Sequence, residues 1–101
     1  MAAVVHHGGA GTTATAARAG AAQVVVPHIP DQYYWASRID KLALGPAPVW
    51  RARLTSNRLA AAIRACVENP TYRENALNAA RIIQNQDPFD KALGFISQAV
   101  G

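Results

Sequence analysis

The order of apolar and polar positions along this chain predicts strands first and helices afterwards. Residues 2–5 form a continuous apolar run, which is typical of a strand buried on both faces of a parallel sheet. Residues 12–19 are rich in alanine and predict a short helix, which Gly20 can end in a left-handed conformation. A second β-branched run occupies residues 23–27. A strand, a helix and a strand in this order predict a right-handed βαβ unit with parallel strands.

The remaining pattern predicts helices and one short edge strand. An amphipathic helix is expected after Asp31 and as far as about Leu44, where Gly45 and Pro46 stop it. Residues 47–50 predict an edge strand, because proline is tolerated at the edge of a sheet and not in its middle. Three further helices are expected to begin at Thr55 or Ser56, at Asn69-Pro70 and at Asp87-Pro88. The chain is therefore expected to have an α/β fold, with a short parallel sheet of about three strands and C-terminal helices.

Composition restricts the chain to one globular domain and favours an anionic partner. Of its 101 residues 50% are apolar and 16% are charged, so a hydrophobic core is expected. The formal net charge is +4 and the sequence pI is about 9.8. The basic residues are scattered, however, and form no cluster like those that bind nucleic acid. We therefore predict an anionic ligand and no nucleic-acid partner.

The cysteine content and the apolar runs bear on the compartment. The single cysteine, Cys66, excludes an internal disulfide and fits a reducing cytoplasm, and its place among apolar residues predicts a buried side chain rather than a nucleophile. No apolar run is long enough to span a bilayer, and the N-terminus lacks a signal-peptide pattern. We therefore expect a cytoplasmic protein. The basic segment 50–53 leaves open a peripheral contact with an anionic membrane, with exposure to solvent as the alternative.

A glycine-rich turn joins the first predicted strand to the first predicted helix. Glycines let the backbone approach a ligand closely, and the unpaired N–H groups and the dipole at a helix N-terminus attract an anion. The turn differs from the dinucleotide fingerprint in the spacing of its glycines, and it lacks the lysine of a P-loop. The sequence predicts a cradle for a phosphate or diphosphate, with a turn that binds no ligand as the alternative. The candidate residues are His7, Gly8, Gly9, Gly11 and Thr12.

A second polar loop follows the second predicted strand. Because the carboxyl ends of parallel strands lie at the same edge of a sheet, the two loops are expected to converge on one crevice. Asp31 and Gln32 in the second loop suit a sugar, because a carboxylate and an amide accept and donate hydrogen bonds to hydroxyl groups. The alternative for Asp31 is the N-cap of the following helix.

Neither a metal site nor a hydrolase triad is predicted. His6 and His7 are consecutive on a strand, so their side chains point to opposite faces and cannot hold one ion together. His28 is the only third histidine and there is no cysteine pair, which makes zinc improbable. No serine lies in a G-x-S-x-G elbow.

Several motifs, taken in order, resemble one family. They are V-V-H-H-G-G-A-G-T-T, R-A-G, V-V-V-P, P-x-x-x-D-Q-x-x-W-A-x-R, L-G-x-x-P and L-T-x-x-x-L-A-x-A-I. With them the chain resembles the donor-binding half of nucleotide-sugar glycosyltransferases, a family that includes bacterial macrolide and glycopeptide enzymes, sterol glucosyltransferases and plant UDP-glycosyltransferases. The later motifs look most like the sterol and glycolipid glucosyltransferase branch. The resemblance covers nearly the whole chain.

The resemblance implies a Rossmann-like half of a GT-B fold, in which two domains face each other across a cleft and the C-terminal one holds the nucleotide sugar. It implies that His7, the glycine turn and Thr12 contact the donor diphosphate, and that Asp31 and Gln32 bond the hexose hydroxyls. Thr15 stands where plant members carry a glutamate that binds the ribose. The implied reaction is inverting transfer of a hexose from a nucleoside-diphosphate sugar to a hydroxyl of a lipid, sterol or natural-product acceptor, without a metal or other cofactor.

By the same resemblance, residues 1–101 are expected to form part of a C-terminal donor domain, without the N-terminal acceptor domain that carries the catalytic base. No catalytic residue is therefore assigned to this chain, and it is expected to be inactive alone. A sheet that lacks neighbouring strands has an unpaired edge, so we expect self-association through the first strand. The alternative function is a non-catalytic module that binds phosphate or a nucleotide, or that has a regulatory role.

Overall fold

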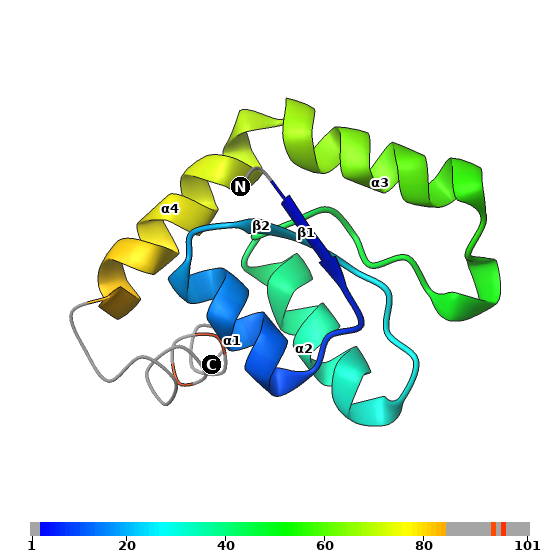
Figure 1. Cartoon of the computed structure of the whole chain (residues 1–101), viewed down its shortest axis with the longest axis horizontal. Coiled ribbons are helices and arrows are strands. Elements are labelled where there is room, and N and C mark those ends of the chain that lie inside the picture. Colours follow the sequence, from blue (N-terminus) through cyan, green and yellow to red (C-terminus); the bar gives the residue numbers. More distant parts are fainter. Residues whose placement is uncertain (1–2, 85–93, 95, 97–101) are drawn as a thin grey trace.

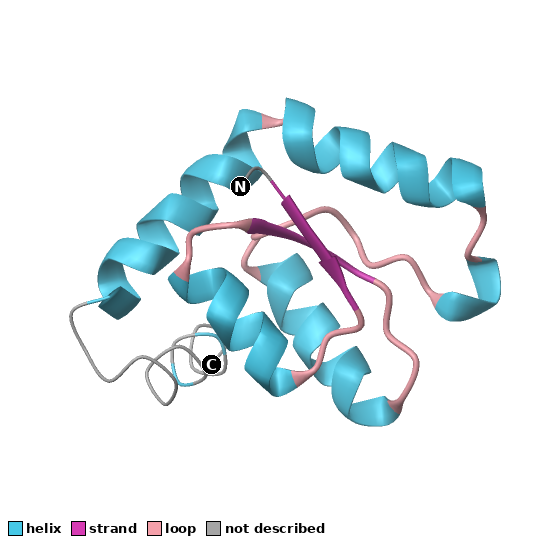
Figure 2. Ribbon diagram, viewed as in Figure 1, coloured by secondary structure: helices cyan, strands magenta, loops and turns pink. Residues whose placement is uncertain are grey.

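The chain folds as a short parallel sheet with helices on both faces (Figures 1 and 2), seen in a computed structural model that describes residues 3–84, 94 and 96. The elements in order are β1 (Ala3–His6), α1 (Ala10–Arg18), β2 (Ala22–Val25), α2 (Pro30–Lys41), the 3-10 turn η1 (Arg51–Arg53), α3 (Ser56–Glu68) and α4 (Pro70–Gln84). This order confirms the predicted βαβ unit and the α/β class.

The two strands run parallel and in register, from Ala3 opposite Ala22 to His6 opposite Val25. One more ladder bond follows, in which the N–H of Val26 donates to the carbonyl of His6 at 2.8 Å. Among the described residues the sheet has two strands, so the expected third strand over residues 47–50 is wrong.

The segment that was expected to form the third strand does lie beside β2. The N–H of Gln23 donates to the carbonyl of Leu44 at 2.9 Å, and the N–H of Val49 donates to the carbonyl of Val25 at 3.0 Å. Between these two bonds Pro46 and Pro48 have no N–H group, so the segment cannot continue a regular ladder.

The two faces of the sheet are covered by different helices. Ala22 and Val24 point to one face and pack against Cys66 of α3, whereas Val25 points to the other face and packs against Ile39 of α2. Helix α1 lies on the same side as α2, and α4 packs against both α1 and β2. Figure 2 shows α3 on the opposite side of the strands from α1 and α2. The thiol of Cys66 is buried, as predicted, and burial raises its pKa.

The two strands differ in burial. All four residues of β2 are buried, whereas β1 is only half-buried and Val5 remains 47% exposed. The expectation that the first strand is buried on both faces is therefore wrong. Within the described residues β1 pairs only with β2, so its other edge has no strand beside it.

Helix α1 begins two residues earlier than predicted and ends one residue earlier, at Arg18. Gly9 is its N-cap, and the N–H of Thr13 donates to the Gly9 carbonyl at 2.9 Å. At the other end Gly20 has a φ of +73°, the left-handed conformation that glycine adopts at low cost. Thr12 therefore lies inside the first turn and not at its start.

Helix α2 is not capped by Asp31. It begins at Pro30, and its N-cap is Ile29. Proline fixes its own φ at a helical value and forces the preceding residue into an extended conformation, and Ile29 accordingly has φ −129° and ψ 163°. Asp31 is thereby moved into the first turn of the helix.

The two long C-terminal helices begin where the sequence predicts. The Thr55 hydroxyl accepts a hydrogen bond from the N–H of Arg58 at 3.1 Å, and the Asn69 side chain accepts one from the N–H of Thr71 at 3.0 Å. The helix expected from Asp87-Pro88 falls outside the described residues, apart from two positions that are helical. No helix in the described part of the chain has both the length and the apolar character needed to cross a membrane.

Candidate functional site

Two loops meet at the carboxyl ends of the two strands. One joins β1 to α1 and contains Gly8, and the other joins β2 to α2 and leads to Gln32. A Cβ atom at Gly8 would lie 2.9 Å from the Gln32 carbonyl oxygen, so the two backbones are in contact there. The rings of His7 and His28 also meet, with centroids 4.3 Å apart and planes inclined by 45°. The predicted convergence of the two loops is therefore confirmed.

Gly8 has a structural reason to be glycine. Its φ is +97°, and a Cβ would also lie 2.9 Å from Cγ1 of Val25. Its N–H donates to Nδ1 of His6 at 2.9 Å. The backbone donor of Gly8 is thus used inside the protein, and its predicted contact with a diphosphate remains a prediction.

Gly9 differs from Gly8 in its backbone conformation and in the space around it. It has φ −63° and ψ 148°, which any residue adopts, and a Cβ built there would have no atom within 4 Å. Nothing in the fold of the described residues therefore requires glycine at this position. The space beside Gly9 is open for a ligand to approach the backbone.

The N-terminus of α1 lies directly behind this open space. No side chain caps it within the described residues, and its first turn contains no acidic residue. Gly11 and Thr12 in this turn are exposed. The N–H groups of the first turn and the positive end of the helix dipole therefore face solvent, an arrangement that suits an anion.

The two consecutive histidines point in different directions, as the strand alternation predicts. His7 is exposed at the end of β1, where its ring meets His28. The His6 ring points inward, and its Nε2 lies 2.6 Å from Oε1 of Gln23 on β2. Burial lowers the pKa of His6, against the opposing effect of this hydrogen bond. His6 was considered in the sequence only as a metal ligand, and its contact with the glycine turn was missed.

His28 adds a second imidazole to the site. His28 lies in the loop after β2, directly after Pro27, and it is partly exposed. Desolvation lowers its pKa, and the neighbouring positive charges of His7 and Arg51 lower it further. The sequence showed His28 only as an isolated third histidine, because its contact with His7 depends on how the two loops converge.

The two predicted sugar-binding residues, Asp31 and Gln32, differ in their surroundings. Oε1 of Gln32 accepts hydrogen bonds from the N–H groups of His28 at 2.8 Å and Ile29 at 3.2 Å, which holds the second loop in place. Because both partners are donors, the amide NH₂ of Gln32 is the group that faces away from the loop. Asp31 is exposed in the first turn of α2.

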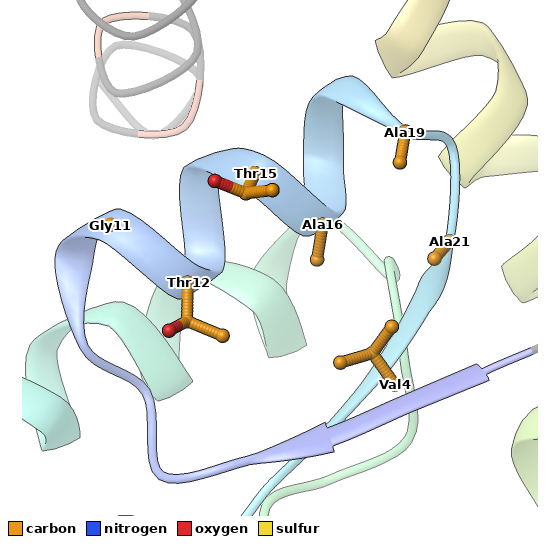
Figure 3. Close-up of a pocket in the computed structure, with 7 residues that line it drawn as sticks. All are labelled: Val4, Gly11, Thr12, Thr15, Ala16, Ala19 and Ala21. Atoms are coloured by element: carbon orange, nitrogen blue, oxygen red, sulfur yellow. The ribbon is translucent and has the colours of Figure 1, made fainter.

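A hollow of about 610 Å³ runs along α1 beside β1 (Figure 3). Figure 3 shows Val4 and Ala16 on its two sides, with Thr12 toward the end where the glycine turn lies. Thr15 also lines it. Its volume is in the range of small-molecule sites, and its walls are mostly apolar with hydroxyl groups at one end.

Within the described residues, no group of three or more histidine, cysteine, aspartate or glutamate side chains is placed to hold a metal ion. The three histidines are divided accordingly: His6 is bonded to Gln23, and only His7 and His28 are in contact.

The chain is similar in sequence to several known proteins. The family described as erythromycin biosynthesis protein CIII-like, C-terminal domain, matches residues 1–88. The chain is 42% identical over 85 residues to a sterol 3-beta-glucosyltransferase of Arabidopsis thaliana, a match that covers 84% of the chain. It is 38% identical over 97 residues, 96% of the chain, to the O-mycaminosyltylonolide 6-deoxyallosyltransferase of Streptomyces fradiae. It is also 57% identical over 47 residues, or 46% of the chain, to the vancomycin aglycone glucosyltransferase of Amycolatopsis orientalis.

These matches cover only a small part of each relative. The chain spans 14% of the Arabidopsis protein, 23% of the Streptomyces protein and 12% of the Amycolatopsis protein.

Proposed function

The chain belongs to the family of erythromycin biosynthesis protein CIII-like C-terminal domains, and from this premise we propose that it forms the donor-binding part of an inverting hexosyltransferase. The observation that carries the proposal is the uncapped N-terminus of α1 behind the open space at Gly9. Both are placed at the carboxyl end of a parallel strand, where α/β proteins bind their ligands.

The diphosphate of a nucleotide sugar is the ligand that this end of the sheet suits best. Its oxygens would accept hydrogen bonds from the first N–H groups of α1 and from the Thr12 hydroxyl, with His7 beside them. Gly9 would let the diphosphate approach the backbone, because no Cβ stands in its way. The contact of the His7 ring with His28 adds a second polar ring at this position.

The sugar and the nucleoside would lie on either side of the diphosphate. Asp31 and the amide NH₂ of Gln32 lie in the first turn of α2, directly after the second loop, where they would bond hexose hydroxyls. The hollow beside α1 would take the nucleoside side of the donor, with Thr12 and Thr15 as its hydroxyl-bearing residues. Thr15 would offer the ribose a neutral hydroxyl rather than a carboxylate.

The proposed reaction is a single displacement at the anomeric carbon. An acceptor hydroxyl oxygen forms a bond to that carbon while the bond to the diphosphate oxygen breaks, and the electron pair leaves with the nucleoside diphosphate. The negative charge that develops there would be stabilised by the α1 N–H groups and His7, and removing one such donor typically costs about 3 kcal/mol of transition-state stabilisation. A base in the remainder of the longer protein would take the proton of the acceptor hydroxyl.

The acceptor is proposed from the relatives. They are named for the glucosylation of sterols and of the vancomycin aglycone and for deoxyallosyl transfer to O-mycaminosyltylonolide. We therefore propose a sterol, lipid or natural-product hydroxyl as the acceptor. The nucleoside-diphosphate sugar is then a substrate, and no metal or other cofactor is part of the proposal.

The test is an amide-resolved NMR titration of the chain with UDP, UDP-glucose and inorganic phosphate. We expect shifts centred on residues 8–13 with UDP and UDP-glucose, and further shifts near Asp31 with UDP-glucose alone. His7→Ala should weaken the first set, and Asp31→Ala should remove only the second. A folded spectrum without shifts at residues 8–13 would contradict the proposal.

A further inference from the structure

A chain of hydrogen bonds runs from the glycine turn through the sheet to helix α1. The N–H of Gly8 donates to Nδ1 of His6 at 2.9 Å, and Nε2 of His6 lies 2.6 Å from Oε1 of Gln23. Nε2 of Gln23 then donates to the carbonyl of Thr13 at 3.3 Å. The Gln23 side chain has no exposed surface, so this polar chain lies inside the protein.

The direction of each bond follows from its first member. A backbone N–H can only donate, so Nδ1 of His6 must carry a lone pair and Nε2 must carry the proton. Nε2 therefore donates to the Gln23 oxygen, and the Gln23 NH₂ is turned toward the Thr13 carbonyl. His6 is thus held neutral in one tautomer, with both ring nitrogens occupied.

The three bonds link the parts of the site that have to keep their relative positions. Gly8 lies between His7 and Gly9 in the turn, and Thr13 is the residue whose N–H makes the first bond of α1 with the Gly9 carbonyl. Gln23 lies on the neighbouring strand and connects the two through its amide.

We propose that His6 is a positioning residue, which orients the glycine turn against the N-terminus of α1 for the donor diphosphate. This inference rests on the proposed function. His6 acts through the Gly8 N–H and does not touch the ligand. A leucine of similar size would fill the space of the ring but leave Gly8 and the Gln23 oxygen without partners, which is costly inside a protein.

The first measurement needs no ligand. Nitrogen-15 spectra of the histidine rings in the wild-type chain at pH 8 should show His6 as the Nε2–H tautomer, with distinct signals for its two nitrogens. The amide of Gly8 should exchange with solvent more slowly than the amide of Gly9. An Nδ1–H tautomer of His6 would overturn the proposal.

The second measurement compares two substitutions of His6 in titrations with UDP and inorganic pyrophosphate. His6→Asn keeps an acceptor at the position of Nδ1, because the asparagine side-chain oxygen occupies nearly the same place. His6→Leu removes that acceptor. We expect His6→Leu to weaken the binding of both probes by about tenfold or more, because small displacements of binding groups have large effects, and His6→Asn to recover most of the loss.

Thr55→Ala serves as the matched control, because it removes a helix cap far along the chain and lowers stability without touching the turn. It should bind both probes as the wild type does. If His6→Leu fails to fold, His6→Asn is compared with Gln23→Leu, which should weaken binding more than His6→Asn does. If the wild type, His6→Asn and His6→Leu (or Gln23→Leu in its place) all bind the probes equally well, the positioning role of His6 is overturned, whereas the proposed function is not. A folded wild type that binds neither probe would contradict the proposed function, and the positioning role with it.

Discussion

Helices α1 and α3 begin in opposite ways. The N-terminus of α3 is closed by the Thr55 hydroxyl, whereas α1 follows Gly9 and has no side-chain cap among the described residues. Helix α4 resembles α3, because the Asn69 side chain accepts from an N–H of its first turn. A cap of this kind typically contributes about 1 kcal/mol to stability. The C-terminal part of the chain thus uses its helix N-termini for stability, and the part with the glycine turn leaves one open.

The contrast between α1 and α3 indicates which unsatisfied backbone groups mark a binding site. An open helix N-terminus is common, but here it coincides with open space at Gly9 and with a second loop in contact with the first. The stability that a cap at Gly9 would add is small beside the binding energy that a diphosphate can gain there. Three substitutions and a change of pH test this contrast, and they differ in their expected effect on the free energy of unfolding.

The largest effect is expected for Gly8→Ala. Its Cβ would meet the Gln32 carbonyl and Val25 at 2.9 Å, in a backbone conformation that alanine rarely adopts. We expect a loss of about 3 kcal/mol, the sum of a strained φ and an overpacked contact. Urea unfolding would measure it, with Gly9→Ala as the matched control that should unfold like the wild type. Equal losses at both glycines would contradict the contrast between them.

The stability of the chain is expected to depend on pH, because two of its histidines have shifted pKa values. All three histidines of the chain lie in its first 28 residues, and the pKa values of His6 and His28 are both lowered from the ordinary 6.5. Between the folded and unfolded pKa values the unfolded chain binds more protons, so stability is full above about pH 6.5 and is lost as the pH falls below it. The slope that His6 contributes is at most about 1.4 kcal/mol per pH unit.

Urea midpoints between pH 8 and pH 5.5 would measure this dependence. His6→Asn, which cannot be protonated at this position, should make the dependence shallower. A wild-type stability that rises as the pH falls through this window would contradict the assignment of neutral, partly buried imidazoles. The pKa of each histidine, followed through its ring proton signals, provides an independent check.

Thr55→Ala should cost about 1 kcal/mol of stability, because it removes the cap of α3 and leaves its first N–H groups to solvent. Binding of UDP should not change. Thermal unfolding gives the first quantity and calorimetric titration the second. Weaker UDP binding in this variant would show that the two parts of the chain are not independent.

The smallest effect on stability, and the sharpest test of function, is expected for Gly9→Asp. Its backbone is already in the extended conformation of an N-cap, so a carboxylate there should stabilise the chain by a few tenths of a kcal/mol. The same carboxylate would occupy the N–H groups of α1 and repel a diphosphate. We therefore expect UDP binding to be lost from a slightly more stable protein, and unchanged binding would contradict the proposed anion site.

The sequence alone predicts the strand, turn and helix around the glycines, because both the apolar runs and the glycine spacing are local signals. The alternative role of Asp31 as a helix cap is wrong, because Pro30, one residue earlier, sets the start of α2 more strongly than a favourable side chain does. The strand over residues 47–50 was expected from its composition, yet Pro48 within it and Pro46 just before it have no N–H group and interrupt the bonding to β2.

The contacts that the sequence did not predict join residues that are far apart along the chain. The alternation of side chains along a strand predicts that the His6 and His7 rings point in different directions. It does not predict that the His6 ring contacts Gln23, seventeen residues later along the chain. The contact of His28 with His7 likewise requires the two loops to be brought together by the sheet. The predicted roles of His7, Asp31 and Gln32 in binding a nucleotide sugar stay predictions until a ligand is tested.

Among the described residues strand β1 pairs with β2 on one edge only, so its amides are expected to differ in the rate of hydrogen exchange. In a parallel ladder successive N–H groups point alternately toward the two neighbouring strands, so alternate amides of β1 are protected by β2 and the others face the edge without a partner strand among the described residues. Deuterium labelling of a dilute sample should therefore divide this one strand into slow and fast amides. If a second copy of the chain adds to that edge, as self-association would require, the fast amides alone should become slow as the concentration rises.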